Sequence, residues 1–336
     1  MNHVWMSHYL PPVSFGGCED LTLTLAQRYG GYLYCPRGSG SKKPGFLSGT
    51  PTYKGIYRRR GIDGDRVVFQ ERVSILAHER IDTVFIMGLY WPEIMALGLR
   101  SIGSASRIVL VPQYHIGDGA TRLRRAQRLG IGKCVNVVMA YTKVEADYVV
   151  KHLKCPQARV VLVPHLAGIC VENESTLPRA TEFGKVKGDP GVLAKGYVLF
   201  PSRPSKGLPA AKSIARQLRL PIVGNMSYGV SGVDGCIDFD RFNPYKGARL
   251  MVSLTKNDSY NIGIAKSMEF KVPAIWDNSN SQIQSIWNEF PTAIPRVHFK
   301  GRDSLKKSRL EAEACKQLLR LKIAKSLARF ERNVIR

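Results

Sequence analysis

Short apolar segments alternate with amphipathic segments along most of the chain. Apolar runs rich in Val, Ile and Leu, such as residues 82–88 and 135–142, are bounded by Gly, Pro, Asn or Asp. Segments with apolar residues three or four positions apart follow them, as at 92–103 and 143–155. Buried parallel strands have continuous apolar runs, and helices connect them. The pattern therefore predicts an α/β protein whose parallel sheets are covered on both faces.

The alternation is interrupted once, by a polar stretch with several Gly and Pro residues and no sustained period at 171–195. We interpret this stretch as a linker. It separates a first doubly wound domain at 1–170 from a second at 196–300. The final residues, 301–336, have the pattern of one or two long basic helices without strands. Ligands of such domains bind at the carboxyl ends of the strands, so the loops after strands should carry the chemistry.

The bulk composition fits two globular domains in a reducing compartment. The chain has 336 residues, and its seven cysteines are scattered without a C-x-x-C pair. This predicts neither a zinc site nor a disulfide framework, and it favours the cytoplasm. The first residues lack the pattern of a signal peptide, and no apolar run approaches the roughly 18 residues of a spanning helix.

The chain is strongly basic. Its 50 Lys and Arg residues exceed its 26 Asp and Glu residues, so the formal net charge is +24. Such an excess is typical of proteins that bind nucleic acid, an anionic membrane surface or phosphorylated substrates. General basicity of the source proteome is the alternative explanation.

Two cations lie in the loop between an apolar run at 197–200 and an amphipathic segment at 208–218. These are Arg203 and Lys206, in the sequence PSRPSKG. A strand that opens onto a helix presents free N–H groups and a positive dipole, to which Arg adds a bidentate donor and Lys a point charge. The loop therefore predicts an anion site, although two solvated surface cations would have the same pattern. The nearest dinucleotide-like string, at 38–45, lacks the required glycine spacing.

The pattern R-x-x-K-G at the start of a second domain resembles the donor-phosphate loop of GT-B glycosyltransferases, especially retaining family four. Segments 10–26, 161–168 and 248–278 resemble further parts of that family, in the same order. The resemblance covers most of the chain. It implies the GT-B fold, with two Rossmann-like domains that face each other across a cleft and a C-terminal helix that crosses back to the first. It also implies sugar transfer from a nucleotide-sugar, most simply a UDP-sugar.

The resemblance assigns a set of residues to the donor. These are Gly16, Gly17, Arg203, Lys206, Gly207, Asn225, Asp258, Asn261, Ile262, Lys266 and Glu269. The family usually has two glutamates, one for the sugar and one for the ribose, where this chain has Asp258 and Lys266. A lysine cannot accept hydrogen bonds from ribose hydroxyls. Either Glu269 or another group holds the ribose, or Lys266 contacts phosphate, or donor binding has decayed, or Lys266 is simply an exposed helix residue.

Catalytic candidates follow a strand of the first domain. His115 lies in the sequence VPQYHIGDG with Asp118 three residues later. In the resembled family, a histidine in this loop approaches the donor sugar, and such a pair could also deprotonate an acceptor hydroxyl. A capping or packing role for His115 remains the alternative. The resemblance assigns neither Asp-x-Asp string of the chain, at 63–65 and 238–240, to a sugar-nucleotide metal site, so we expect metal-independent transfer that requires no cofactor.

Basic residues cluster in two loops of the first domain, where GT-B enzymes bind the acceptor. Together with the interleaved Tyr57, they are Lys42, Lys43, Lys54, Arg58, Arg59 and Arg60 in the first loop, and Arg122, Arg124 and Arg125 in the second. Arginines beside aromatic rings suit nucleic acid. Segments 113–131 and 267–277 resemble phage DNA glycosyltransferases. That resemblance implies double-stranded DNA with a hydroxymethylated base as the acceptor, reached by base flipping in the host cytoplasm.

Three other functions stay open at this stage. A peripheral membrane glycosyltransferase would use the basic segment 122–132 to reach a lipid-linked or cell-surface glycan on an anionic membrane. A catalytically decayed GT-B scaffold would bind nucleic acid without chemistry. A soluble glycan or small molecule could also be the acceptor. The sequence leaves the sugar, the nucleotide, the stereochemical outcome and the oligomeric state open.

Overall fold

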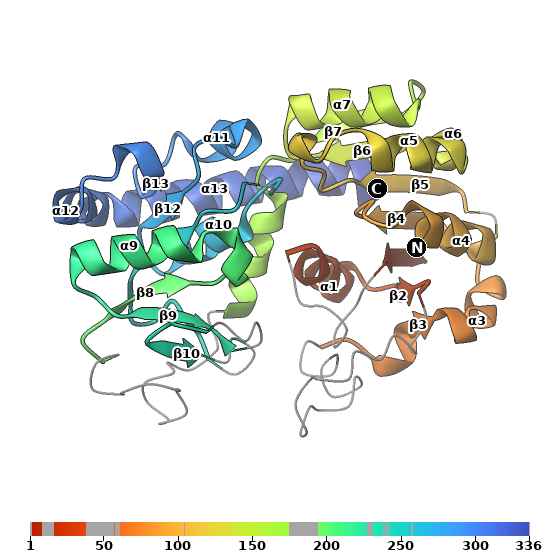
Figure 1. Ribbon diagram of the computed structural model, residues 1–336. Coiled ribbons are helices and arrows are strands. Elements are labelled where there is room, and N and C mark those ends of the chain that lie inside the picture. Colours follow the sequence, from red (N-terminus) through yellow and green to blue (C-terminus); the bar gives the residue numbers. More distant parts are fainter. Residues whose placement is uncertain are drawn as a thin grey trace. The chain divides into compact units, whose positions relative to one another are not determined.

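The computed structural model describes residues 2–8, 17–37, 57, 61–103, 105–174, 194–226, 231–237, 239, 242–256 and 258–335, with the main chain only for 172–174. The chain divides into two compact units (Figure 1). Unit 1 comprises Met1–Leu166 with Ser326–Arg336, and unit 2 comprises Ala167–Lys325. Each unit is described by itself.

Unit 1 is built on a parallel sheet. Its described strands are β1 (His3–Ser7), β2 (Tyr32–Cys35), β3 (Val67–Phe69), β4 (Thr83–Met87), β5 (Arg107–Val111), β6 (Val137–Ala140) and β7 (Arg159–Leu162). They lie in the order β3-β2-β1-β4-β5-β6-β7, and every pair is parallel. The order reverses between β1 and β4, which marks the position where doubly wound sheets bind ligands.

Helices cover both faces of this sheet. They are α1 (Gly17–Tyr29), α3 (Ser74–Ala77), α4 (Pro92–Ile102), α5 (Thr121–Arg128), α6 (Ile131–Cys134) and α7 (Lys143–Leu153). Short 3-10 helices span Gly64–Arg66, Gln70–Arg72 and Ile116–Asp118. The basic segment 122–132 divides into two helices, α5 and α6, at Gly130. This glycine has a φ of 83°, in the left-handed region that ends a helix.

Strand alternation explains the two faces. Val4 and Met6 of β1 and Ile86 of β4 belong to the core that includes residues of α4, α5 and α7, which pack against one another (Figure 1). On the opposite face, Trp5 stacks on Phe85 with ring centroids 4.0 Å apart. Successive side chains of a strand point to opposite faces, so a single apolar run supplies both cores.

Unit 2 has a second parallel sheet. Its described strands are β8 (Tyr197–Phe200), β9 (Ile222–Asn225), β10 (Gly235–Ile237), β11 (Ala248–Ser253), β12 (Ala274–Trp276) and β13 (Ala293–Pro295). The order is β10-β9-β8-β11-β12-β13, again with every pair parallel. Here the order reverses between β8 and β11.

The helices of unit 2 are α9 (Leu208–Leu218), α10 (Ile262–Glu269), α11 (Ser281–Trp287), α12 (Arg302–Leu310) and most of α13 (Ala312–Phe330). The 3-10 helices are Leu166–Glu174, Pro204–Lys206 and Arg296–His298, and a π-helical turn at Glu331–Ile335 follows α13 in the part of the chain that belongs to unit 1. Apolar residues of α9 pack on β8 and β11 to form the core, with Val198, Phe200, Ala211 and Val252 fully buried.

Helix α13 belongs to both units. Its first part packs in unit 2, where Cys315, Leu319 and Ile323 are buried. Its last residues lie in unit 1, where the Ser326 hydroxyl accepts a hydrogen bond from the His165 main-chain N–H at 3.2 Å. The structure therefore confirms two parallel, doubly wound sheets and a C-terminal helix that returns to the first unit. No described helix is long and apolar enough to cross a membrane.

Candidate functional site

The loop after β8 carries the two predicted phosphate-binding cations. Arg203 has an extended backbone (φ −63°, ψ 150°), as expected for a residue that precedes proline. Lys206 follows in a 3-10 turn that is closed by a 2.9 Å hydrogen bond from its N–H to the Arg203 carbonyl. Both side chains are exposed. The turn thus holds two cations at the carboxyl end of a strand, just before α9.

Gly207 fixes how closely this loop approaches the neighbouring strand. Its φ is 99°, and a Cβ at this position would lie 2.8 Å from the Leu254 Cβ. Real Cβ atoms do not approach so closely, so glycine is required by both conformation and space. The loop after β8 is therefore packed against the loop after β11, at the point where the strand order reverses.

Side-chain hydrogen bonds hold the loop after β11 in place. Asp258 Oδ1 accepts from the N–H groups of Tyr260 and Asn261 at 3.2 and 3.0 Å. Asn280 donates to the carbonyls of Lys256 and Asp258 at 2.9 and 2.8 Å. Asn261 has a φ of 60° and donates to the Ser253 hydroxyl at 2.9 Å. These contacts fix the chain that leads into α10.

The start of α10 lies beside the loop after β8. A Cβ on Gly263 would lie 3.9 Å from Pro201 Cγ and 3.4 Å from Asn261 Oδ1. Two helices, α9 and α10, therefore begin at the same edge of the sheet, and the N–H groups of a helix start favour an anion. With Arg203, Lys206 and the half-buried Lys266 of α10, this edge suits a phosphate group.

The remaining predicted donor residues occupy different environments. Asn225 ends β9 and is buried, and Ile262 is the first residue of α10. Asp258 uses Oδ1 within its own loop, and the described residues offer its Oδ2 no hydrogen bond. That oxygen remains available to a ligand hydroxyl.

Glu269 ends α10 with both carboxylate oxygens engaged. Arg320 of α13 donates to Oε2 at 3.0 Å and also contacts Oε1, which Lys316 approaches at 3.1 Å. Burial alone would raise the pKa of Glu269, but the hydrogen bonds from Arg320 and Lys316 outweigh it and lower the pKa. The ribose contact predicted for Glu269 would require one of these ion pairs to open.

His115 and Asp118 lie together in the loop after β5. His115 precedes the 3-10 turn Ile116–Asp118, and its Nδ1 lies 3.7 Å from Asp118 Oδ1. Asp118 Oδ2 also approaches Arg122 Nη1 at 3.3 Å. A Cβ on Gly117 would lie 2.4 Å from the imidazole, so a larger residue here would displace the His115 ring. The structure thus brings the predicted catalytic pair together at the carboxyl edge of unit 1.

A buried carboxylate supports this loop. Glu145 of α7 accepts from the main-chain N–H of Tyr114 at 2.8 Å and of Tyr141 at 3.0 Å. Burial raises the pKa of Glu145 to about 7, although these N–H groups act to lower it. Glu145 therefore fixes Tyr114, the residue directly before His115. The sequence signal for Glu145 was only that of an acid in the first turn of a helix.

Sequence reasoning missed an exposed aromatic pair beside these residues. Tyr90 and Trp91 follow β4 and are 38% and 47% exposed. The Arg122 guanidinium lies over the Tyr90 ring at 5.6 Å, and that of Arg37 over the Trp91 ring at 5.8 Å. The available signal was an aromatic pair before proline, at the end of an apolar run.

A histidine beneath this pair is held neutral. The ring of His8 lies 5.4 Å from that of Tyr90. Burial, followed by the charges of Arg37 and Arg122, lowers the pKa of His8 to about 4. We name Arg37, Tyr90, Trp91 and Arg122 the ring–arginine cluster.

The predicted acceptor residues divide into two groups. Arg122, Arg124 and Arg125 are exposed on α5, where Arg125 pairs with Glu93. The Tyr57 ring is fully buried, in contrast with the surface position that the prediction assumed. The other predicted acceptor residues lie outside the described residues: Lys42, Lys43, Lys54, Arg58, Arg59 and Arg60. Of the two glycines assigned to the donor, Gly17 begins α1 and is exposed, and Gly16 lies outside the described residues.

No protein-family model matches the sequence, and no curated protein matches it. Solved structures, however, are similar over the whole chain. HepE from Anabaena in complex with UDP has a TM-score of 0.60 at 12% identity, covering 99% of this chain and 95% of that chain. The trehalose-6-phosphate synthase OtsA has a TM-score of 0.58 at 13% identity, covering 97% and 96%. This is the GT-B fold.

A further GT-B neighbour is the UDP-forming α,α-trehalose-phosphate synthase of Burkholderia xenovorans in complex with glucose-6-phosphate. Its TM-score is 0.57 at 11% identity, covering 97% of each chain. At such identities the likeness establishes the fold, and an assignment of activity depends on the site itself. Among the described residues, no three His, Cys, Asp or Glu side chains are grouped as a metal site would require.

Proposed function

We propose that the protein is a glycosyltransferase that moves a sugar from a UDP-sugar to an acceptor hydroxyl without a metal ion. The observation that carries this proposal is the edge of unit 2 where Arg203 and Lys206 lie beside the starts of α9 and α10. HepE, which shares the fold, has been crystallised with UDP and with UDP-glucose. The GT-B fold supports this chemistry by analogy, and the two cations supply the physical reason for it.

The phosphate contacts serve catalysis as well as binding. When the bond between the anomeric carbon and the diphosphate breaks, negative charge develops on the leaving oxygen. Arg203 can donate two parallel hydrogen bonds to phosphate oxygens, and Lys206 adds a compact charge. Helix N–H groups that are already oriented stabilise the same charge without reorganisation. In this proposal, these groups supply the stabilisation that a metal ion supplies in other transferases.

Polar groups around the same edge would hold the rest of the donor. Asp258 Oδ2 would accept from a sugar hydroxyl, and Asn261 and the N–H of Ile262 at the start of α10 would contact the donor beside it. Asn225 and Gly207 border the edge on β9 and α9. Lys266, which is one turn into α10, would contact phosphate, because an ammonium group cannot accept from ribose.

His115 is the proposed catalytic group of unit 1. It would take the proton of the acceptor hydroxyl or contact the donor sugar, with Asp118 orienting the imidazole. Glu145 acts as a positioning residue because it holds Tyr114. The backbone of Gly17, at the start of α1, would contact the donor at close range.

The favoured acceptor is a hydroxymethylated base in duplex DNA of a phage. The net charge of +24 supports a polyanion. Arg124 and Arg128 lie four residues apart on α5, exposed and without a carboxylate partner among the described residues. The ring–arginine cluster adds surfaces on which a flipped base could stack. The basic loop at 42–60 belongs to the same proposal.

The test begins with a thermal-shift screen against a panel of nucleotide-sugars, followed by transfer assays on hydroxymethylated and unmodified DNA. The proposal predicts stabilisation by a UDP-sugar and transfer to the modified duplex only. Binding to anionic vesicles without duplex binding would instead indicate a lipid-linked acceptor. A protein that no nucleotide-sugar stabilises would be a non-catalytic scaffold.

Arginines of α5 provide a sharper test of the acceptor. Replacing Arg124 and Arg128 with Gln should weaken duplex binding and reduce its salt dependence. Each phosphate contact adds to the slope of the logarithm of the affinity against the logarithm of the salt concentration. The control replaces Lys151 and Lys154, which are also exposed in unit 1. If duplex binding had the same salt dependence in both double variants, α5 would not be part of the acceptor site.

A further inference from the structure

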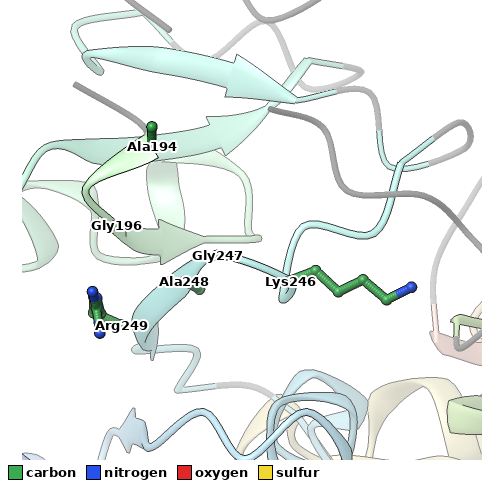
Figure 2. Close-up of a pocket in the computed structure, with 6 residues that line it drawn as sticks. All are labelled: Ala194, Gly196, Lys246, Gly247, Ala248 and Arg249. Atoms are coloured by element: carbon green, nitrogen blue, oxygen red, sulfur yellow. The ribbon is translucent and has the colours of Figure 1, made fainter. Parts of the chain in front are cut away.

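A second group of cations lies at the opposite end of the sheet of unit 2. Gly196 directly precedes β8, whereas Arg203 follows it. A strand rises about 3.3 Å per residue, so the four residues of β8 separate the two ends by about 13 Å. Near Gly196, the chain forms a pocket of about 330 Å³ lined by Ala194, Gly196 and residues 246–249 (Figure 2). This pocket is separate from the proposed donor edge.

A β-bulge places an arginine at this pocket. The register between β11 and β8 shifts between Ala248 and Leu250, which leaves Arg249 as the extra residue. Bulges redirect side chains out of the ladder. Arg249 and Lys246 extend to opposite sides of the Gly247–Ala248 stretch (Figure 2). Gly196 gives the side chain room, because a Cβ there would lie 2.5 Å from Arg249 Nε.

A second arginine adjoins the first from α12. Arg309 Nη2 donates to the Arg249 carbonyl at 3.4 Å, and Arg249 Nη2 donates to the Lys195 carbonyl at 3.5 Å. Burial, followed by the charge of Arg249, lowers the pKa of Arg309. Within the described part of the chain, neither guanidinium forms an ion pair with a carboxylate. Two like charges therefore lie near each other, and no carboxylate of the described residues neutralises them.

An adjoining pocket of about 300 Å³ completes the site. Its lining includes both arginines together with Lys246, Lys271, Tyr245 and Phe270. The rings of Tyr245 and Phe270 stack with centroids 5.8 Å apart. Lys271 is partly neutralised by Glu313 at 2.5 Å. Both arginines are exposed, so an anion can reach them from solvent.

We propose that Arg249 and Arg309 form a binding site for a phosphate group, either free phosphate or a phosphomonoester, on unit 2 away from the donor edge. A guanidinium has five N–H donors in a planar fork that matches phosphate oxygens, and each of these two donates one bond to a main-chain carbonyl. A bound dianion would offset the repulsion between the two arginines. The inference does not depend on the proposed transferase activity.

The test measures binding of inorganic phosphate to the full chain by titration calorimetry. Both Arg203 and Lys206 are replaced with Ala throughout, so that the donor edge does not contribute. Charge-assisted hydrogen bonds of this kind are worth about 1.5–3 kcal/mol, so Arg249→Gln or Arg309→Gln should each weaken phosphate binding at least tenfold. The matched control is Arg216→Gln, an exposed arginine of α9 outside both pockets, which should change the affinity less than twofold.

A second arm distinguishes the source of the phosphate group. Phosphatidylcholine vesicles with and without phosphatidic acid are tested by flotation with the same variants. Flotation that needs phosphatidic acid and Arg249, and that free phosphate displaces, would identify a lipid phosphomonoester. Phosphate binding without flotation would identify a soluble ligand. Absence of saturable phosphate binding, or equal losses in Arg249→Gln and Arg216→Gln, would overturn the proposal.

Discussion

The carboxyl ends of the two sheets are built from different chemistry. In unit 2, the edge has exposed cations, helix starts and a loop fixed by Asn and Asp side chains. In unit 1, the edge has buried titratable groups beneath exposed aromatic rings. Burial lowers the pKa of His8 and raises the pKa of Glu145, and both shifts favour the neutral form. Arg203 and Lys206, in contrast, are exposed.

This difference separates two tasks within one fold. Binding a phosphate needs charge and N–H groups, which a loop and two helix starts can present at the surface. Proton transfer needs groups held in a defined state, and such groups require burial and fixed neighbours. We therefore infer that unit 2 binds the donor and that unit 1 provides the acid–base chemistry and the acceptor surface.

The largest expected effect concerns unit 2. Replacing both Arg203 and Lys206 with Ala removes two charged contacts to the diphosphate. At about 1.5–3 kcal/mol for each contact, UDP-sugar affinity should fall by about 10²–10⁴-fold. Calorimetry measures this, with Arg216→Ala and Lys306→Ala as a double control of equal charge. A loss below tenfold would assign the phosphate to another part of the chain.

His115→Ala should act on turnover rather than on donor binding. General acid–base groups contribute about 10²–10⁴-fold to the rate, so kcat should fall by at least about 10²-fold while UDP-sugar affinity is retained. His78→Ala, an exposed histidine of the same unit, is the control. Wild-type turnover in the His115 variant would make this residue purely structural.

Glu145 should make the stability of unit 1 depend on pH. Its folded pKa of about 7 lies above the ordinary 4.5, so the folded state keeps a proton that the unfolded chain releases. This contribution is fully present below about pH 4.5 and is lost as the pH rises through 7, amounting to about 3 kcal/mol. Hydrogen exchange of the strands of unit 1 measures the change.

The matched variant for this prediction is Glu145→Gln, which cannot titrate. In this variant, the protection of the unit 1 strands from hydrogen exchange should show no comparable decrease between pH 4.5 and 7. Glu311→Gln changes an exposed residue and should behave like the parent. Parallel pH profiles for the parent and Glu145→Gln would mean that Glu145 titrates normally.

The smallest effect is expected at the aromatic surface. Trp91→Leu keeps apolar bulk but removes the ring, and stacking of a base is worth about 1–3 kcal/mol. Affinity for hydroxymethylated duplex DNA should fall about tenfold, with UDP-sugar binding unchanged. Leu97→Ala is the control, at a residue of α4 that is 40% exposed. Unchanged DNA affinity would remove the ring–arginine cluster from the acceptor surface.

The fold was predictable because its signals are local. Each strand of both sheets is a short apolar run, and Pro204 and Gly207 mark the turn that carries the cations. Arg203, Lys206, His115 and Asp118 could be proposed as site residues from the sequence because each pair lies within four residues of one turn. Such features need no knowledge of distant neighbours.

Other features depend on residues far apart in the sequence. Glu269 is neutralised by α13, about fifty positions later, and Arg249 meets Arg309 sixty positions away. Glu145 has an ordinary helix-start pattern, and only burial raises its pKa. Tyr57 sits in a polar, basic stretch and is nevertheless buried. A hydrophobic pattern does not report these pairings, because tertiary packing creates them.

The central claim is that the edge of unit 2 binds a diphosphate through Arg203 and Lys206. It is tested most directly by titrating UDP and uridine into the parent chain and into the Arg203→Ala, Lys206→Ala double variant. The account predicts that the parent binds UDP at least about 100-fold more tightly than uridine, and that this preference is nearly lost in the variant. An equal preference for UDP in both proteins would contradict it.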